Sequence, residues 1–460
     1  MTAVAATSVD HLAPAALGAR ASALLERDRW SREQLVAYQR ERLRGLIRHA
    51  VERSPYYRTA LGPGAERYEL EELPTLPKRL LMEQFDRIVT DRRLGLRDLE
   101  PFLAHADAGS LYLEEYRVFS TAGTTGVPGL FVYSERDFAH WVSLCIRSFA
   151  RLGLTPKTRI VGVGAPSALH LSQQVIAAMQ AGRGGAPAVS VTTPLEEIVA
   201  ALNAYRPEVL AGYASMMGVL AEEQLQCRLA IEPRVVLTTS EVLTDDAAAR
   251  IASVWTTPVE GYFSTEAVVI AAGSLDRVGL HVCEDVIVEV VDETNKPVPP
   301  GTPGARVLLT NLVQDTQPLI RYELSDAVQL EAGVDPSGRP YDRIARVDGR
   351  SDDVLRLPAV RGDGIQVHPY RLRAPFVRLL DVLQYQIVHR AGRLVVRIVV
   401  RDTAPRDLPD RVRDAVADAL AEAGARCPVE VEVVRSIARE SGHAAKVKLV
   451  VSDVGRPSKG

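Results

Sequence analysis

Residues 195–238 read LEEIVAALNAYRPEVLAGYASMMGVLAEEQLQCRLAIEPRVVLT, and this stretch decides the fold class. A helical pattern over Leu195–Tyr205 is followed by Val209–Ala211, an apolar run that is short enough to be a buried strand. A second helical pattern, Met216–Cys227, and a second apolar run, Val235–Thr238, repeat the order. Such alternation of helices and strands indicates an α/β core with parallel strand pairing.

The alternation continues on both sides of this stretch. We expect a helix over Phe138–Leu152 and a strand over Arg159–Val163 before it, and a helix over Asp245–Val254 after it. From Val282 the pattern changes to strands separated by a Pro/Gly-rich turn at Asn295–Gly304, which predicts a β-rich subdomain.

A second change follows a cluster of charges at Asp348–Asp353. The chain beyond it has the length of a small domain and predicts an α+β sandwich. Its expected elements are a helix over Pro409–Ala423 and strands over Arg393–Val400, Val429–Val434 and Val447–Val451. We therefore expect an α/β protein with a large N-terminal domain of α/β and β-rich subdomains, residues 1–349, and a small mobile α+β domain, residues 350–460.

Composition excludes several classes of protein. The chain has 460 residues, of which 47% are hydrophobic and 25% charged, as in ordinary globular proteins and unlike disordered or collagen-like chains. The 55 basic and 58 acidic residues give a net charge of −3, so no basic field favours a nucleic-acid partner. No CxxC pair, signal peptide or 18-residue apolar run is present, and we expect a cytoplasmic protein without a membrane span. Enzymes of this size often form symmetric dimers, which makes a homodimer the base-rate expectation.

A loop rich in glycine and threonine gives the first indication of chemistry. Val118–Leu130 reads VFSTAGTTGVPGL. Backbone N–H groups freed by glycine can line an anion-binding concavity, and hydroxyl groups can hold phosphate oxygens. A Walker A loop is excluded because no lysine follows the last glycine, and an ordinary turn remains the alternative. The candidate phosphate-binding residues are Ser120, Thr121, Gly123, Thr124, Thr125 and Gly126.

Four further segments follow this loop in a recognisable order. They read GYFSTE at Gly261–Glu266, RYELSD at Arg321–Asp326, GRSDD at Gly349–Asp353 and GHAAKVK at Gly442–Lys448. Together with the loop they resemble the adenylate-forming superfamily of acyl-CoA synthetases, adenylation domains and luciferases. The likeness is closest to the phenylacetate–CoA ligase family, through SPYYR at Ser54–Arg58 and GLHVCED at Gly279–Asp285. It extends from about Glu33 to Asp453.

The resemblance implies an ATP-dependent ligase that activates a carboxylic acid. The acid attacks the α-phosphorus of ATP, with Mg²⁺ as the metal, and the resulting acyl-adenylate is transferred, with CoA as the first-choice acceptor. We expect a small aromatic acid. Two alternatives remain: the same adenylation with an amine or a carrier-protein thiol as acceptor, and an inactive nucleotide-binding homologue.

The resemblance also implies roles for individual residues. Tyr262 matches the residue that stacks on adenine, Thr265 the hydroxyl at the α-phosphate, and Glu266 the magnesium ligand. Asp326 matches the carboxylate that accepts the ribose hydroxyls, and Arg350 an arginine at the ribose or phosphates. The remaining positions are Ser240 and Glu241 on the adenine side, Asp352 as the hinge, and Tyr213, Val236, Gly261 and Phe263 in the acid pocket.

A lysine from the small domain should bridge the acid carboxylate and the phosphate. Lys446 matches this position best and Lys448 is the second candidate. The sequence departs from the family pattern at three places: Ala445 replaces the usual glycine before the lysine, Ala122 replaces a serine of the loop, and Phe263 replaces a glycine. His281 and Cys283 are residue types that bind zinc, but two candidates do not make a site, and we expect them to be structural.

Overall fold

The computed structural model describes most of the chain. The described residues are 10–107, 109–121, 129–165, 167, 170–180, 188–276, 279–350, 355–360, 364–367, 371–372, 375–376, 379, 381–439 and 446–454, with the backbone alone described at 180, 188, 350 and 366.

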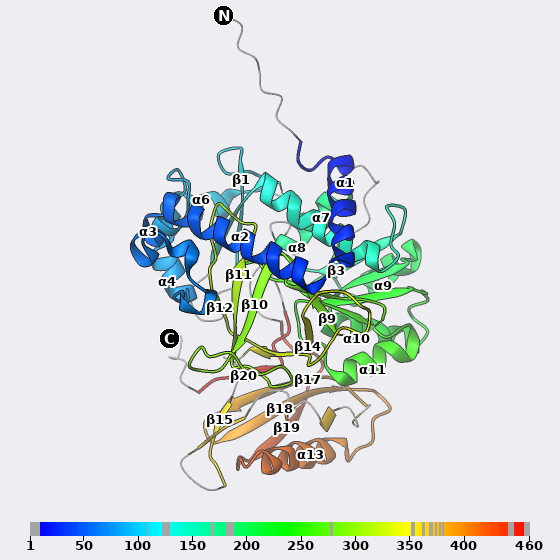
Figure 1. Ribbon diagram of the computed structural model, residues 1–460. Helices are drawn as coiled ribbons and strands as arrows, with labels where there is room; N and C mark the ends of the chain where they lie inside the picture. Colours follow the sequence, from blue (N-terminus) through cyan, green and yellow to red (C-terminus); the bar gives the residue numbers. More distant parts are fainter. Residues whose placement is uncertain are drawn as a thin grey trace, which may run out of the picture.

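The helices cover the sheets and connect their strands (Figure 1). In chain order they are α1 (Pro14–Leu25), η1 (Glu26–Arg29), α2 (Arg32–Arg53), α3 (Pro55–Leu61), η2 (Ala65–Arg67), η3 (Leu70–Glu72), α4 (Lys78–Glu83), α5 (Phe85–Ile88), α6 (Leu96–His105), α7 (Glu135–Arg151), α8 (Leu171–Gln180), α9 (Leu195–Tyr205), α10 (Ala214–Leu225), α11 (Asp245–Val254) and α13 (Leu408–Glu422).

The strands fall into several sheets. They are β1 (Tyr116–Ser120), β2 (Leu130–Ser134), β3 (Ile160–Gly164), β4 (Ala188–Ser190), β5 (Val209–Tyr213), β6 (Val235–Thr239), β7 (Val259–Tyr262), β8 (Ala271–Gly273), β9 (Leu280–Val282), β10 (Val286–Val291), β11 (Arg306–Asn311), β12 (Tyr322–Leu324), β13 (Asp326–Leu330), β14 (Arg343–Arg350), β15 (Leu355–Leu357), β16 (Ile365–Val367), β17 (Val382–Arg390), β18 (Arg393–Val400), β19 (Val429–Val433) and β20 (Val450–Ser452).

The largest sheet in the described part of the chain has nine strands in the order β13-β14-β9-β8-β7-β6-β5-β3-β4. The pairs from β4 to β7 are parallel, which confirms the α/β core expected from the alternation of helices and strands. From β7 to β13 the pairs are antiparallel, so the sheet is mixed. Because the parallel strands run in one direction, their carboxyl ends meet at one edge of the sheet, where ligands bind in open α/β folds.

Smaller sheets pack against this one. Strands β10, β11 and β12 form the antiparallel, β-rich part expected after Val282, and β1 pairs with β2. A large apolar core joins these sheets to α2, α7 and α8, with Trp141 and Phe138 fully buried within it.

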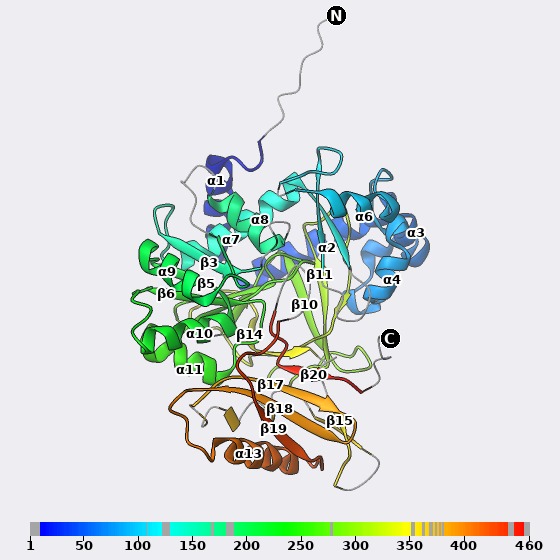
Figure 2. The same ribbon diagram turned by 180° about the vertical axis from the view of Figure 1, so that it is seen from behind.

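A C-terminal unit lies beneath the larger part of the molecule, with α13 on its far side (Figures 1 and 2). Within the described residues its sheet has four strands in the order β19-β18-β17-β20, and its apolar core is separate from the others. Arg250 of α11 connects the two parts, because its guanidinium donates to the backbone oxygens of Val382 at 2.6 Å and Leu383 at 2.9 Å.

Most of the expected elements lie within two residues of their predicted bounds, and two begin three residues away. Helix α7 begins at Glu135, before Phe138, because the Ser134 side chain accepts a hydrogen bond from the backbone N–H of Asp137 and caps the helix. Strand β20 begins at Val450, after Val447, because the backbone groups of Val447 and Lys448 bond to the side chains of Glu241 and Gln386, and the ladder with β17 starts only at Val450. No helix in the described ranges is long and apolar enough to cross a membrane.

Candidate active site

A cavity of about 1040 Å³ lies at the carboxyl ends of the parallel strands and reaches the C-terminal unit. Segments that are distant in the sequence meet here: the end of β1, the turns after β5 and β6, the turn after β7, the start of β13 and the segment before β20. The predicted site residues that line it are Ser120, Thr121, Tyr213, Ser240, Glu241, Gly261, Tyr262, Phe263, Thr265, Glu266, Asp326 and Lys446.

One side of the cavity carries hydroxyl and carboxylate groups. The Tyr262 hydroxyl donates a hydrogen bond to Asp326 Oδ2 at 2.7 Å, which joins the ends of β7 and β13. The turn after β7 is held by the Tyr133 hydroxyl, which donates to the backbone oxygen of Thr265 at 2.6 Å. Glu266 is buried, and burial together with this nearby carboxylate raises the pKa of Tyr133 well above its usual value. Tyr133 therefore stays a neutral donor.

Thr121, which directly precedes residues 122–128, also lines the cavity. Thr121 Oγ1 accepts hydrogen bonds from the backbone N–H of Gly129 at 3.0 Å and from Lys78 Nζ at 3.1 Å. A cation and a hydroxyl group are therefore placed next to the loop whose sequence predicts phosphate binding. Lys78 was not predicted from the sequence, although the chain has only six lysines and this one follows a proline-rich connector.

Glu241 links the turn after β6 to the C-terminal unit. Its Oε2 accepts from the backbone N–H of Ser215 at 3.0 Å, and its Oε1 accepts from the backbone N–H of Val447 at 2.7 Å. Arg439 Nη1 lies 3.8 Å from the same carboxylate. Burial raises the pKa of the Tyr213 phenol and Glu241 adds to the shift, so Tyr213 is neutral beside this carboxylate. Glu241 was predicted on the adenine side; the structure shows that it holds the residue next to Lys446.

Lys446 and Lys448 both line the cavity and are half-buried. The segment that carries them is fixed at two points. One is the bond from Val447 to Glu241, and the other is the Gln386 side-chain amide, which donates to the backbone oxygen of Lys448 at 2.9 Å. A lysine on this anchored backbone can bring its positive charge into the cavity.

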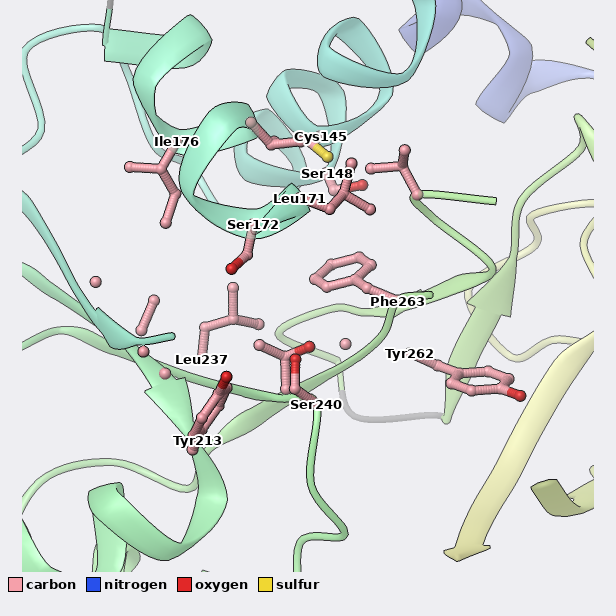
Figure 3. A pocket seen from close by; sticks show the side chains of 18 of the residues that line it. Cys145, Ser148, Leu171, Ser172, Ile176, Tyr213, Leu237, Ser240, Tyr262 and Phe263 are labelled. Carbon is pink, nitrogen blue, oxygen red and sulfur yellow. The ribbon is translucent and has the colours of Figure 1, made fainter. Parts of the chain in front are cut away.

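Phe263 divides the polar side of the cavity from an apolar side. Figure 3 shows its ring pointing into the middle, with Cys145, Ser148 and Leu171 on one side and Tyr213 on the other. The ring folds back over β7, since a Cβ atom on Gly261 would lie 2.6 Å from Phe263 Cε2. Only glycine permits this approach.

Val236 does not belong to the acid pocket. Its side chain is fully buried in the core on the other face of β6, whereas the neighbouring Leu237 and Thr239 line the cavity. Successive side chains of a strand point to opposite faces of the sheet. Because both faces of β6 are buried, its sequence is apolar throughout and does not show which residues face the cavity. The prediction of Val236 is therefore wrong by one residue.

Several predicted residues lie outside the described part of the chain: Gly123, Thr124, Thr125, Gly126 and Asp352. The backbone of Arg350 pairs with that of Asp326 in the register of β14 and β13, while its side chain is not described. Asp348 and Arg439 are further charged residues at the site that the sequence analysis did not single out.

His281 and Cys283 are both buried. His281 Nε2 lies 2.6 Å from Asp335 Oδ2, and burial lowers the pKa of this histidine. Burial raises the pKa of the Cys283 thiol well above its usual value, so the sulfur stays protonated. Among the described residues no group of three or more His, Cys, Asp or Glu side chains is arranged to hold a metal ion.

Comparison with known proteins gives consistent results. The family model of AMP-binding enzymes matches residues 117–309. The chain is similar to phenylacetate-coenzyme A ligase of Thermus thermophilus, with 30% identity over 78% of this chain and 79% of that one. It is similar to phenylacetate-coenzyme A ligase of Escherichia coli, with 26% identity over 79% and 81%. Among solved structures, 2-hydroxyisobutyryl-CoA ligase in complex with 2-HIB-AMP matches its fold with a TM-score of 0.72, 21% identity and coverage of 90% and 89%.

Proposed function

The chain belongs to the phenylacetate-coenzyme A ligase family, and we propose which of its residues carry out the reaction of that family. The protein is an AMP-forming acid–CoA ligase that uses ATP and CoA. In the first step a carboxylate oxygen of the acid attacks the α-phosphorus of ATP and pyrophosphate leaves. In the second step the CoA sulfur attacks the acyl carbonyl and AMP leaves, which gives a thioester.

The first step brings together two anions, so the site must neutralise charge and align the reactants. Asp326 accepts hydrogen bonds from the ribose hydroxyls, and the Tyr262 ring packs against the adenine. Lys78 and the Thr121 hydroxyl hold the terminal phosphates at the base of the loop. Support for these roles comes from the position of all four residues on the polar side of one cavity.

Glu266 is the residue that would hold Mg²⁺. Its carboxylate is buried and lines the cavity beside Thr265, and such oxygen ligands together with phosphate oxygens suit a small hard cation. When bound, the metal neutralises charge on the phosphates. Thr265 donates its hydroxyl hydrogen to an α-phosphate oxygen.

Lys446 acts in the first step. Its ammonium approaches from the C-terminal unit and bridges the acid carboxylate and the α-phosphate, where negative charge develops in the transition state. The unit of residues 350–460 then turns about Asp352, removes Lys446 and admits CoA. The single observation that carries this proposal is the bond from the Val447 backbone to Glu241, because it holds the Lys446 segment at the cavity.

Acid-dependent exchange of labelled pyrophosphate into ATP tests the first step, and thioester formation with CoA tests the second. We expect exchange with at least one acid of an aromatic and aliphatic panel, and CoA-dependent thioester with the same acid. No exchange with any acid, in protein that binds ATP, would contradict the proposal. A homodimer and a cytoplasmic location remain predictions, which light scattering and cell fractionation would check.

A further inference from the structure

The cavity has a branch that the chemistry at the phosphates does not use. We call it the apolar arm: it starts at Phe263 and runs between β3, α7 and α8 to α1. The side chains that these helices contribute to it are all uncharged. They come from Ala21, Ser22 and Leu25 of α1, Cys145, Ile146, Ser148, Phe149 and Ala150 of α7, and Leu171, Ser172, Gln173, Val175, Ile176 and Met179 of α8. Burial raises the pKa of the Cys145 thiol to about 12, so this residue is neutral too.

Two residues without side chains lie along one wall of the arm. Strand β3 has Gly162 and Gly164 two positions apart, hence on one face of the sheet, and both line the cavity. A Cβ atom at Gly162 would lie 3.1 Å from Ile176 Cδ1, whereas one at Gly164 would meet nothing within 4 Å. Glycine inside a strand weakens it and often marks the close approach of a ligand. The missing side chain at Gly162 therefore makes room for Ile176 of α8, and the missing side chain at Gly164 leaves open space beside β3 among the described residues.

The far end of the arm reaches the surface. Ser22 and Leu25 of α1, together with Thr155, Pro156, Lys157 and Arg159 after α7, line the cavity and are exposed, so the arm is apolar along its length and carries two cations at this end. Among the described residues the arm is therefore open at this end to a substrate chain that enters from the Phe263 side.

A small aromatic acid would occupy the region around Phe263. Along the arm it would leave the apolar walls that the described residues form without a substrate group against them. Burying apolar surface there is favourable in proportion to the area removed from water. We propose that the acid substrate carries an extended, uncharged apolar tail, as in a medium-chain fatty acid or a long ω-phenylalkanoic acid, and that this tail lies in the apolar arm. The inference rests on the proposed function and specifies its substrate class.

A series of acids tests the length of the tail. Straight-chain acids of increasing length and ω-phenylalkanoic acids, starting from phenylacetate, would be compared by kcat/KM in pyrophosphate exchange. We expect kcat/KM to rise beyond phenylacetate by up to about fourfold for each methylene that enters the arm. A steady fall in kcat/KM as the chain grows beyond phenylacetate would overturn the inference.

Substitutions that place a bulky side chain in the apolar arm test whether the tail of the acid lies there. Ser148→Phe places a ring in the arm, and we expect the ratio of kcat/KM for a ten-carbon acid to that for phenylacetate to fall by tenfold or more. Ser253→Phe is the matched control, because Ser253 is also a helical serine bonded to its own helix backbone but lies on α11 away from the cavity. Its ratio should stay at the wild-type value. Ala21→Phe, at the α1 end, supplies a second variant if Ser148→Phe does not fold.

The outcomes separate the two proposals. Exchange with short acids and none with long ones overturns the inference and leaves the ligase function in place. A preference for long acids that neither filled variant reduces overturns the position of the tail. An absence of exchange with every acid instead contradicts the proposed function itself.

Discussion

At the scale of single residues, the charge on Lys446 decides the first half-reaction. Lys446→Ala should lower acid-dependent pyrophosphate exchange by about 10²–10³-fold, because the ammonium stabilises charge that develops in the transition state. ATP affinity should change little, since the ground state makes little use of the contact. Lys448→Ala is the matched control on the same segment. Loss of exchange in Lys448→Ala with normal exchange in Lys446→Ala would transfer the role to Lys448.

Glu266 sets the dependence on magnesium. Glu266→Gln keeps the size of the side chain but removes its charge, so we expect the magnesium concentration for half-maximal exchange to rise by about tenfold or more. Titration of the exchange rate with MgCl₂ at fixed ATP measures this shift. A titration curve that coincides with that of the wild type would show that another group holds the metal.

Asp137 makes stability depend on pH. Burial raises the pKa of this carboxyl to about 6 from 3.8, with the Ser134 hydrogen bond opposing the shift. The folded state therefore binds the proton more tightly, and the stability gained from the protonated form is lost as the pH rises from about 4 to about 6. Asp137→Asn should raise Tm relative to the wild type at pH 8 and lose this advantage near pH 4. An advantage that is the same at both pH values would contradict the assignment.

At the scale of elements, the segment before β20 is positioned by Glu241. Glu241→Ala removes the acceptor for the Val447 backbone, and a hydrogen bond to a charged group contributes about 1.5–3 kcal/mol. We expect pyrophosphate exchange to fall by about tenfold or more. Thioester formation from supplied acyl-adenylate should fall less, because Lys446 acts only in the first step. Glu241→Gln keeps an acceptor oxygen and should recover much of the exchange; equal loss in both variants and both steps would exclude a positioning role.

Elements whose apolar residues repeat at a clear helical or strand period could be predicted from the sequence. Contacts between elements that are distant in the sequence could not. Helices α9 and α11 occupy the predicted residues because their apolar positions repeat at the helical period. Strands β8 and β9 have three residues each, too few to show any period, so the antiparallel half of the large sheet was missed. The position of Lys78 depends on α4 packing beside β1 and β2, which no local pattern encodes.

At the scale of the whole molecule, motif order predicted which segments would converge, and the structure brings at least one described residue of each segment to one cavity. Composition and charge could not predict the apolar arm, because it is formed by four elements that meet only in the fold. The contacts that Arg250 and Glu241 make between the larger part and the C-terminal unit could not be predicted either. Each joins residues that are more than 130 positions apart in the sequence.

A crystal structure with a non-hydrolysable phenylacetyl-adenylate analogue, an acyl sulfamoyl adenosine, tests the central claim most directly. The account predicts adenine packed against the Tyr262 ring and the ribose hydroxyls hydrogen-bonded to Asp326. It also predicts the acyl group beside Phe263 at the entrance of the apolar arm, and the Lys446 ammonium within hydrogen-bonding distance of the analogue. An ordered analogue bound at another surface, or bound in the cavity with Asp326 and Lys446 both remote from it, would contradict the account.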